Sequence, residues 1–380
     1  MPYITVKQSP IFRQISLDDI LNGEVDVKDY VVPNYTNTRT VFAQEVNENF
    51  LEKFNIAQMI YVLTGFNIRF EELIKADKSD LYNTFYIPKH SGGLRRIDAP
   101  NDELKEALRV LKDIFENQMF ALYHTTAFAY IKGRCTVDAI RRHQQNNSKW
   151  FAKFDFSDFF GSTTPEFVMN MLSMIFPFSE IVKNSNGKQA LETALSLCFL
   201  NGGLPQGTPI SPVITNIMMI PIDHAISNKL REQERSNYIY TRYADDILIS
   251  SRYSFNCDEI QNFIVDILKR FSAPFTIKKE KTRYGSSSGR NWNLGIMLNK
   301  DNQMTVGHKK NKQFKAMIDH YIKDKKNGVS WEVGDVQVMS GLISYYKMIE
   351  REYIEYVIKQ NEAKYQINLY ELIRGDLYRA

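Results

Sequence analysis

Cysteine, long apolar runs and an excess of charge of either sign are all lacking in this 380-residue chain. Its three cysteines, Cys135, Cys198 and Cys257, lie far apart and form no CxxC pair. This spacing argues against a disulfide framework and a zinc finger, and it is typical of proteins from a reducing compartment. No apolar run reaches the roughly 18 residues of a membrane-spanning helix, and the N-terminus lacks the apolar core of a signal peptide. We therefore expect a cytoplasmic protein without a membrane partner.

The formal net charge of +4, from 48 basic and 44 acidic residues, argues against a histone-like polycation and against a disordered acidic chain. The charge is nevertheless uneven along the sequence. Residues 1–85 hold 12 acidic and 8 basic residues, whereas residues 277–326 hold 13 basic and 4 acidic ones. Such a basic block is either an ordinary solvated face or a surface that follows a phosphate backbone.

Apolar spacing and turn residues predict the main elements. Helical spacing over Glu45–Ile74 indicates a helical N-terminal region, and residues 85–100 have the pattern of strand, turn and strand. Residues 150–160 predict a strand that ends in acidic residues, and residues 238–249 predict a hairpin. We also expect one long buried helix over Val213–Leu230, a strand over Phe275–Lys278, and mostly helical structure over Trp331–Ala380.

Two pairs of aspartates stand in otherwise apolar segments. Asp155 and Asp158 close a run of strand-forming residues, while Asp245 and Asp246 interrupt the expected hairpin. Buried carboxylates need a partner or a cation, whereas a hairpin turn would expose the Asp-Asp pair to water harmlessly. If the two strand ends meet, Asp155 lies beside Asp245, and such an oxygen-rich site suits Mg²⁺. Two such ions activate an attacking 3′-hydroxyl and stabilise a leaving pyrophosphate in nucleotidyl transfer.

Six segments then follow one another in a specific order. They read FYIPKHSGGLRRIDAP from residue 85, FAKFDFSDFFGS from 151, GLPQGTPISPVITN from 203, YADD from 243, FTIKKEKT from 275 and NLGIMLN from 293. YADD alone is a weak four-residue match, but its place among the other five is specific. In this order the chain resembles the bacterial reverse transcriptases over roughly residues 85–350. The segments are similar, in turn, to the fingers hairpin, motifs A, B, C and D, and the primer-grip region of that family.

The resemblance implies an α+β right-hand polymerase fold with fingers, a palm made of an antiparallel sheet packed on helices, and an α-helical thumb. We expect residues 1–84 to form a helical N-terminal region, 85–300 the fingers and palm, and 301–380 the helical thumb or C-terminal region. The implied activity is RNA-directed DNA synthesis, in which an RNA template, expected to be a partner noncoding RNA, is copied into DNA from dNTPs. The resemblance also allows a homo-oligomer or an accessory effector protein as a partner.

The resemblance also assigns the carboxylates. Asp155 and Asp245 would hold two Mg²⁺ ions, which Mn²⁺ can replace, and Asp246 would be the weaker third ligand. Asp158 is not implied by the metal pattern, and we interpret it as a cap or turn residue at the strand end. We interpret His143, which precedes motif A, as a structural histidine or a template contact.

Five residues of the matching segments would contact the incoming nucleotide. Lys89, Arg95 and Arg96 correspond to fingers residues that bind the triphosphate, for which a planar guanidinium is well suited. Phe160 corresponds to the aromatic ring that rejects a ribose 2′-hydroxyl. Gln206 corresponds to a further nucleotide contact, next to glycines that let the backbone approach closely.

The basic residues after the palm have two expected roles. Lys281, in competition with Lys278 and Lys279, corresponds to the lysine that protonates the leaving pyrophosphate. RNA would be recognised through backbone charge and shape. The expected RNA contacts in the basic block are Lys309, Lys310 and Lys312.

The subgroup is indicated by departures from neighbouring groups. Retron enzymes carry Asn-Ala-x-x-His before motif A, where this chain has Asp138-Ala139 and a later His143. They also carry Val-Thr-Gly where this chain has Asn293-Leu294-Gly295. These departures favour the defence-associated, abortive-infection or unclassified bacterial enzymes, which are related to the retron and group II intron enzymes, and thus a role in anti-phage defence.

Several alternatives stay open at this stage. One is a retron-type enzyme that makes RNA-linked DNA, and another is a template-independent or protein-primed DNA polymerase of the same fold. An RNA-directed RNA polymerase is disfavoured by Phe160 and by YADD. A catalytically idle RNA-binding scaffold is disfavoured by the intact carboxylates together with Gln206 and Arg95.

Overall fold

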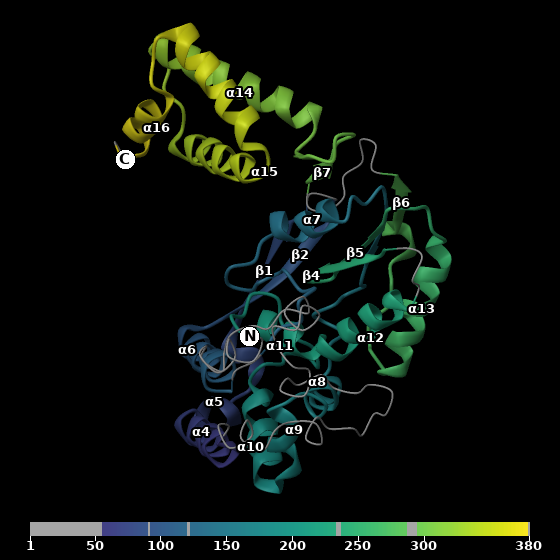
Figure 1. Cartoon of the computed structure of the whole chain (residues 1–380). Coiled ribbons are helices and arrows are strands. Elements are labelled where there is room, and N and C mark those ends of the chain that lie inside the picture. The colour runs from purple at the N-terminus through teal and green to yellow at the C-terminus, as the bar shows by residue number, and fades with distance from the viewer. Residues whose placement is uncertain (1–54, 90–91, 120–121, 233–236, 287–294, 379–380) are drawn as a thin grey trace.

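The computed structural model of the chain describes residues 55–89, 92–119, 122–232, 237–286 and 295–378 (Figure 1). Two sequence-based expectations fall partly outside these residues. They are the helical N-terminal region up to residue 54 and the Asn293-Leu294 part of the segment that resembles the primer grip. Within the described ranges, no helix combines the length and the apolar character needed to cross a membrane.

A four-stranded antiparallel sheet forms the centre of the molecule, with the strand order β4-β5-β3-β6 (Figure 1). Its strands are β3 (Trp150–Asp155), β4 (Ile239–Tyr243), β5 (Asp246–Ser251) and β6 (Arg283–Ser286). Aromatic residues make up half of β3, and Ile247, Leu248 and Ile249 form the apolar middle of β5, as expected for strands that are covered on a face. The strand predicted before the acidic residues and the hairpin predicted over residues 238–249 are both confirmed.

The strand predicted over Phe275–Lys278 is wrong. Only Ile277 makes a single bridge, to Phe156, and a short 3₁₀ helix, η5 (Lys279–Lys281), follows at once. The reason is the burial of Phe275, whose ring packs against the rings of Phe156 and Phe159 at 4.8 and 5.1 Å between centroids. The apolar residues of this segment therefore fill the core instead of extending the sheet.

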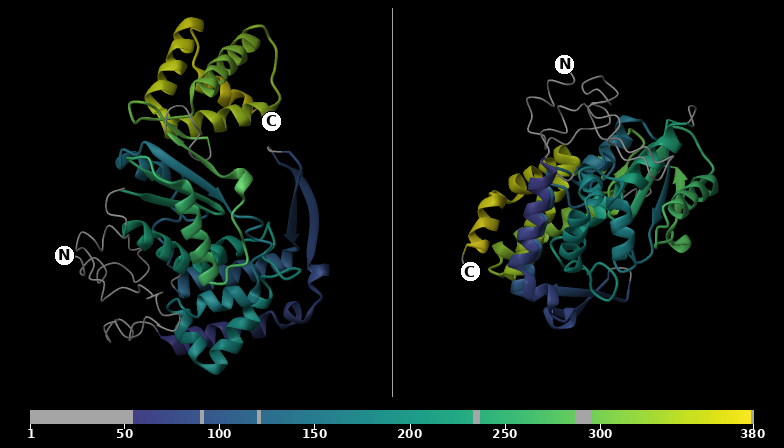
Figure 2. Two further views of the ribbon diagram at one scale, coloured as in Figure 1. Left: turned by 90° about the vertical axis from the view of Figure 1, so that its right-hand side faces the viewer. Right: turned by 90° about the horizontal axis from the view of Figure 1, so that it is seen from below.

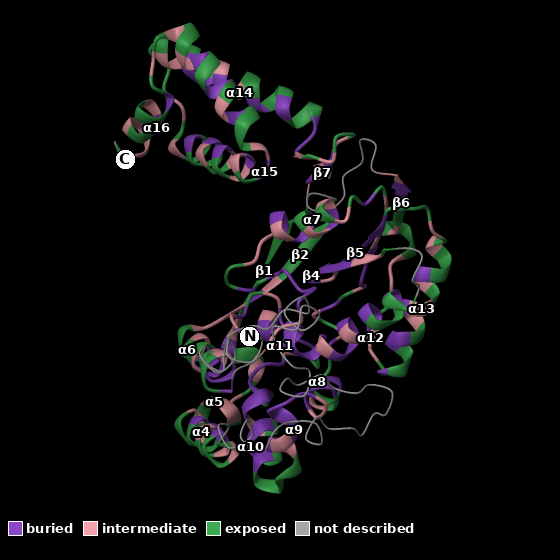
Figure 3. Cartoon of the chain, viewed as in Figure 1, coloured by how far each residue is buried: buried purple, intermediate pink, exposed green. Residues whose placement is uncertain are grey.

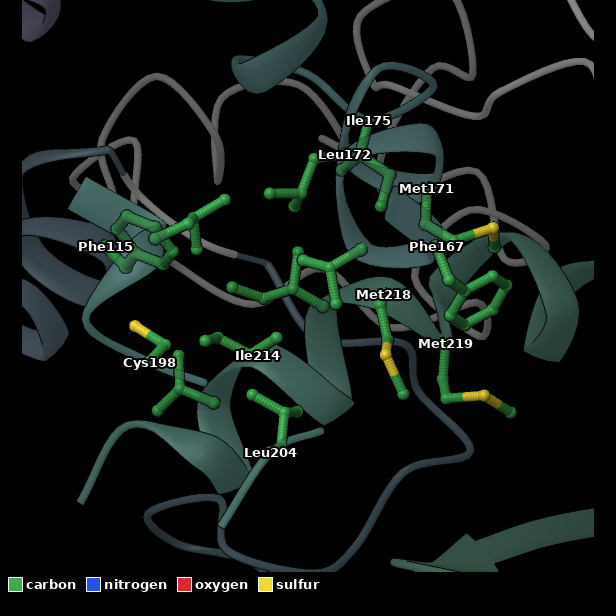
Figure 4. Close-up of a cluster of buried hydrophobic side chains, with 14 of the residues drawn as sticks. Phe115, Phe167, Met171, Leu172, Ile175, Cys198, Leu204, Ile214, Met218 and Met219 are labelled. Atoms are coloured by element: carbon green, nitrogen blue, oxygen red, sulfur yellow. The ribbon is translucent and has the colours of Figure 1, made fainter. Parts of the chain in front are cut away.

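One face of the sheet packs on helices and forms the first core (Figure 3). Ala152 and Phe154 of β3 and Ile247 and Ile249 of β5 point into it, as the alternation of a strand requires. The helices are α8 (Pro165–Leu172), α11 (Ser211–Met218), α12 (Ile220–Arg231) and α13 (Cys257–Arg270). Figure 4 shows part of this core, in which side chains of α8 and α11 gather with Phe115, Cys198 and Leu204.

The single long helix predicted over Val213–Leu230 is wrong, because two helices, α11 and α12, meet at Met219. Pro221 stands in the first turn of α12. Its ring would clash with the carbonyl group four residues earlier in a continuous helix, and it has no N–H to donate, so the helix restarts there. The break leaves both helices buried, as expected, but gives them different directions.

The described part of the N-terminal region is helical, as predicted, and packs into the same first core. It consists of α4 (Ile56–Arg69), α5 (Glu71–Lys75) and the 3₁₀ helix η3 (Lys78–Leu81). Asn55 caps α4 by accepting the N–H of Gln58 at 2.9 Å. Helix α4 lies against α9 (Phe178–Lys183) and α10 (Ser185–Ser196), and Asn67 Nδ2 donates to the Ala190 carbonyl at 2.9 Å.

The two strands predicted within residues 85–100 are confirmed as β1 (Tyr82–Pro88) and β2 (Leu94–Pro100), which pair as an antiparallel hairpin. Figure 2 shows this hairpin projecting along one side of the molecule, away from both cores. Helix α6 (Asp102–Asp113) follows, with Asn101 accepting the N–H of Leu104 as its cap, and continues into the π-helical turn η4 (Ile114–Gln118).

Three helices at the C-terminal end form a second core, and the expected helical character of this region is confirmed for the described residues. They are α14 (His308–Lys326), α15 (Val333–Tyr365) and α16 (Leu369–Leu377), joined to the rest through the short strands β7 (Met297–Leu298) and β8 (Met304–Thr305). Phe151 of β3, Leu248 of β5 and Val137 of α7 (Thr136–Gln145) belong to the same cluster. The second face of the sheet is therefore covered at one end only (Figures 1 and 2).

His143 of α7 is a structural residue, one of the two roles expected for it. It is fully buried, with Nδ1 2.5 Å from Ser250 Oγ and Nε2 2.8 Å from Thr241 Oγ1. These contacts join α7 to β4 and β5. Burial, together with the nearby charge of Arg142, lowers the pKa of His143 to about 3.

Acid should weaken the fold through this buried histidine. Because the pKa in the folded chain lies below that of the unfolded chain, protons bind the unfolded state preferentially as the pH falls below about 6.5. One such group removes about 2 kcal/mol of unfolding free energy between pH 7.5 and pH 5. Between these two pH values, we expect His143→Gln to lose about 2 kcal/mol less unfolding free energy than the wild type does. Urea unfolding at both pH values measures this.

The comparison is between pH values within each variant, so a general destabilisation by the substitution cancels. His308→Gln, at an exposed position, serves as the control and should keep the pH dependence of the wild type. Equal losses in the wild type and His143→Gln would contradict the prediction.

Candidate active site

The YADD turn, Tyr243–Asp246, is a hairpin loop of two residues. Tyr243 pairs with Asp246, so Ala244 and Asp245 form the loop itself. Ala244 has a φ of 56°, the positive value that tight hairpin loops require at their first position. It is also buried, which favours a small side chain there. The turn therefore presents Asp245 at the end of the sheet, directly before β5.

Strand register brings the three aspartates together. Asp155, the last residue of β3, lies directly opposite Asp246, the first residue of β5. The N–H of Phe156 donates to the Asp245 carbonyl at 3.1 Å and holds the turn against the end of β3. Asp155 is buried and the other two are partly buried, so the turn does not place the Asp-Asp pair in open water. Asp158 is an exposed turn residue with a φ of 43°, as predicted.

Three lysines make ion pairs with these carboxylates. Lys281 Nζ lies 3.1 and 3.0 Å from the two oxygens of Asp155, and Lys278 Nζ lies 3.1 Å from Oδ1. Lys153 Nζ lies 3.0 Å from Oδ2 of Asp246. Burial lowers the pKa of Lys281, but the bond to Asp155 and the charges of Asp155 and Asp245 together outweigh it, so the net pKa is raised and the ammonium group stays charged. The structure thus places Lys281 beside Asp155.

Negative charge is crowded at the YADD turn. Burial raises the pKa of Asp245, and the charges of Asp246 and Asp155 raise it further. Burial also raises the pKa of Asp246, against the opposing effect of Lys153. A cation would relieve this crowding, and carboxylate oxygens are the ligands that Mg²⁺ prefers. The donor set therefore fits a divalent ion.

Within the described part of the chain, no group of three or more His, Cys, Asp or Glu side chains is arranged to close on a metal ion by itself. This agrees with the usual behaviour of Mg²⁺ in phosphoryl transfer, where one or two carboxylates share the ion with water and substrate phosphates. The aspartates fit such a shared shell better than a closed protein cage.

The loop before α11 meets the turn that follows β3 at Phe160. The N–H of Leu204 donates to the Phe160 carbonyl at 3.0 Å. Gly203 comes so close that a Cβ there would lie 2.0 Å from the Gly161 carbonyl oxygen, which excludes any side chain. The Gln206 carbonyl in turn accepts the N–H of Asp98 at 2.8 Å. Phe160 and Gln206, both partly buried, are thus held beside the base of the fingers hairpin.

Arg95 and Arg96 lie on opposite faces of that hairpin, as neighbours in a strand must. Arg95 shares its face with Ile97, whose Cγ2 would lie 3.1 Å from a Cβ on Gly207. That face therefore points toward the loop before α11. Arg96 is on the other face, where its Nε donates to Asp98 Oδ1 at 2.8 Å. Lys89 is exposed just beyond β1, and its N–H donates to the Gly93 carbonyl at 2.9 Å.

The expected RNA-binding lysines lie on a different element from the aspartates. Lys309, Lys310 and Lys312 are exposed in the first turns of α14, where no acidic residue stands in the first turn. Positive charge at the N-terminus of a helix opposes the helix dipole. A nearby anion would offset this unfavourable arrangement.

A family model described as reverse transcriptase (RNA-dependent DNA polymerase) matches residues 87–317, which is more than half of the chain. The chain belongs to the reverse transcriptase family. This assignment makes it an RNA-directed DNA polymerase of the expected α+β fold, and it implies a general dependence on divalent metal ions.

Curated relatives agree with this family. The reverse transcriptase is 26% identical over 303 residues to the retron Ec83 reverse transcriptase of Escherichia coli, covering 77% of this chain and 90% of that one. It is 27% identical to the retron Ec73 reverse transcriptase of E. coli, covering 70% and 82%. A solved telomerase of Candida albicans is 13% identical, with a TM-score of 0.42 over 78% of this chain and 58% of that chain.

Two further residues at the site of this reverse transcriptase escaped sequence reasoning. Lys153 stands two residues before Asp155 and bonds to Asp246. Because side chains alternate along a strand, the sequence alone could have placed Lys153 and Asp155 on the same face. Tyr130 has a φ of 60°. Burial raises the pKa of its phenol, with further contributions from Asp245 and Tyr243 and an opposing one from Arg95. Nothing in the local sequence indicates that Tyr130 lies near Asp245, because the contact depends on the tertiary fold.

Neutralising Asp245 should stabilise the metal-free reverse transcriptase. Because the pKa of Asp245 is raised in the folded chain, its ionised form is destabilising at neutral pH. We expect Asp245→Asn to increase the unfolding free energy in EDTA at pH 8 by about 0.5–2 kcal/mol, the usual gain when strain at a functional site is relieved. Urea unfolding measures it.

The matched control is Asp158→Asn, which changes the same charge at an exposed turn and should leave stability within about 0.5 kcal/mol of the wild type. If Asp245→Asn instead lowers the unfolding free energy, the ionised carboxylate of Asp245 stabilises the fold and the prediction is wrong.

Proposed function

We propose that this reverse transcriptase copies a partner noncoding RNA into DNA, with Asp155, Asp245 and Asp246 holding two Mg²⁺ ions. The observation that carries the proposal is the pairing of Asp155 with Asp246, with Asp245 in the adjoining turn. Supporting it, the pKa values of two of the three carboxylates are raised, mainly by burial and further by the neighbouring carboxylates, and a bound cation would offset this. Bound there, the two ions would activate the primer hydroxyl and neutralise charge on the triphosphate; Mn²⁺ would serve as a substitute.

The lysines beside the aspartates have a role in the same proposal. Lys281 would give a proton to the leaving pyrophosphate, which is supported by its charged Nζ 3.0 Å from Asp155. Lys278 pairs with the same carboxylate and could substitute for it. Both ammonium groups would exchange Asp155 for phosphate oxygens when the triphosphate enters.

The fingers hairpin and the loop before α11 would form the nucleotide pocket. Arg95, on the face toward that loop, and Lys89, near the end of the hairpin, are the proposed triphosphate contacts. Arg96 would reach the triphosphate only after releasing Asp98. Gln206 would contact the nucleotide, and the Phe160 ring beside it would exclude a ribose 2′-hydroxyl.

A retron-type enzyme that makes RNA-linked DNA is the second candidate, favoured by the similarity to the reverse transcriptases of retrons Ec83 and Ec73. The departures at Asp138 and at Asn293-Leu294-Gly295 stand against it. Digesting the product with RNase separates the two candidates, because only an RNA-linked DNA changes its mobility. A role in anti-phage defence is part of the proposal and rests on the family resemblance alone.

DNA synthesis by the full chain tests the central proposal. The protein and its co-purified RNA, supplied with Mg²⁺ and labelled dNTPs, should make DNA that DNase removes. Asp245→Ala should reduce the rate by about 10³-fold or more, as loss of an essential catalytic group does. Asp158→Asn, which changes a nearby exposed carboxylate, should remain active.

The same assay decides among the alternatives. Equal incorporation of rNTPs and dNTPs would favour an RNA-directed RNA polymerase and remove the assigned role of Phe160. RNA retained by a chain that makes no DNA would favour the scaffold. Synthesis without any RNA would favour a template-independent enzyme.

RNA binding should depend on the basic end of α14. We propose that Lys309, Lys310 and Lys312 contact the RNA backbone, because all three are exposed and none is offset by an acid in the first helical turn. Replacing all three by Gln should weaken binding and flatten the dependence of log Kd on log salt by about 2, at about 0.7 per phosphate contact. Filter binding at several salt concentrations measures this.

The matched control replaces Lys75, Lys183 and Lys188, which are equally exposed on α5, α9 and α10 at the opposite end of the molecule (Figure 1). It removes the same charge and should keep the wild-type slope. If both triple variants flatten the slope equally, binding depends on net charge and not on α14.

A further inference from the structure

A fully buried ion pair lies directly under the YADD turn. Arg242 of β4 is 1% exposed and Asp223 of α12 is 0% exposed. Arg242 Nε lies 2.9 and 3.1 Å from the two oxygens of Asp223, and Nη2 lies 2.8 Å from Oδ2. Tyr240 adds a bond from its hydroxyl to Asp223 Oδ1 at 2.6 Å.

Stability alone does not account for such a pair. Desolvating two charges offsets their attraction, and well-packed apolar residues of similar volume are often as stable or more so. A buried ion pair is therefore best explained by what it holds in place. The planar fork of arginine makes several bonds in fixed directions, so it can fix other groups relative to Asp223.

The group held in place is the backbone of the YADD turn. Arg242 Nη1 donates to the Ala244 carbonyl at 3.2 Å and to Asn216 Oδ1 at 3.3 Å. The Ala244 carbonyl belongs to the peptide unit that enters Asp245. Because Ala244 already has a positive φ of 56°, the orientation of that peptide unit needs an external restraint.

The same cluster restrains the segment that runs beside β4. Asn216 Nδ2 donates to the Ala129 carbonyl at 2.8 Å. The backbone of Arg242 bonds to Thr126 at 2.7 Å and to Phe128 at 2.9 Å. The pair thus joins three parts of the chain, namely the helices after the Gln206 loop, the YADD turn, and the segment that leads to Tyr130.

We infer that Arg242, held by Asp223, is a positioning residue that sets the direction in which Asp245 presents its carboxylate to the catalytic metal ions. The inference rests on the proposed function of the aspartates. Neither residue contacts the carboxylate of Asp245, so each acts through the Ala244 peptide. Residues that orient metal ligands in this way typically change metal affinity by 10–100-fold when they are replaced.

Two variants test it in the full chain. Arg242→Lys keeps a charge opposite Asp223 but cannot bond to Asp223 and the Ala244 carbonyl in the same geometry. The double variant Arg242→Met, Asp223→Leu removes both charges and keeps apolar packing, so the fold is preserved without the bond to Ala244. Circular dichroism and gel filtration confirm folding in each case.

Both variants should require about 10-fold or more Mg²⁺ for half-maximal DNA synthesis. They should lose about 10²-fold in kcat, with the KM for dNTP within about 3-fold of the wild type. Mn²⁺ binding without nucleotide, followed by electron paramagnetic resonance, should weaken in parallel. Tyr240→Phe is the matched control, because it removes a bond to Asp223 and leaves the bonds of Arg242 to Asp223, Asn216 and the Ala244 carbonyl in place.

A folded double variant with wild-type Mn²⁺ affinity and Mg²⁺ requirement would overturn the inference and leave the pair a purely structural role. The metal titration also separates this inference from the proposed function. If the wild type binds Mn²⁺ but makes no DNA, the proposed function fails, while the Mn²⁺ affinities of the variants still decide the role of Arg242.

Discussion

The register between β3 and β5 is the constraint on which the site depends. A strand has a side-chain period of two, so a slip of one residue would turn Asp155 into the first core and Phe154 toward the open face. The slip is prevented because Ala152, Phe154, Ile247 and Ile249 are all buried on that core side. The hydrophobic pattern of the palm therefore fixes which carboxylates meet, before any metal or substrate binds.

The open face of the sheet results from unequal coverage. The second core covers the end of the sheet around Phe151 and Leu248, whereas the end that carries Asp155 and Asp246 bears charged side chains. Burial keeps the pKa values of Asp245 and Asp246 raised there, although Lys153 lowers that of Asp246. Keeping these partly buried carboxylates is a stability cost of a site suited to cations, as is usual when function and fold compete.

The sequence predicted the structure best in segments where side-chain alternation and a turn signal occur together. The strand before Asp155, the hairpin with YADD and the fingers hairpin each combine alternation with a turn signal, so their structure could be predicted locally. The errors arose where tertiary packing decides. Phe275 has the residue type of a strand, but its ring packs in the core. The apolar pattern of Val213–Leu230 predicts one helix, but Pro221 divides it into two. For the site, the sequence predicted which aspartates gather but not which arginine of the hairpin faces the loop before α11.

The fingers hairpin, which carries the proposed triphosphate contacts, depends on the rest of the chain for its structure. Nearly every residue of β1 is exposed, and a two-stranded hairpin on its own is marginally stable in water. Its order depends on its base, where the Asp98 N–H bonds to Gln206 and where Gly207 leaves room for Ile97. Both anchors belong to the loop that also holds Phe160 through Leu204. The position of Arg95 and the position of the ring proposed to select the sugar are therefore set by one loop, so a change in that loop would alter phosphate binding and sugar selection together.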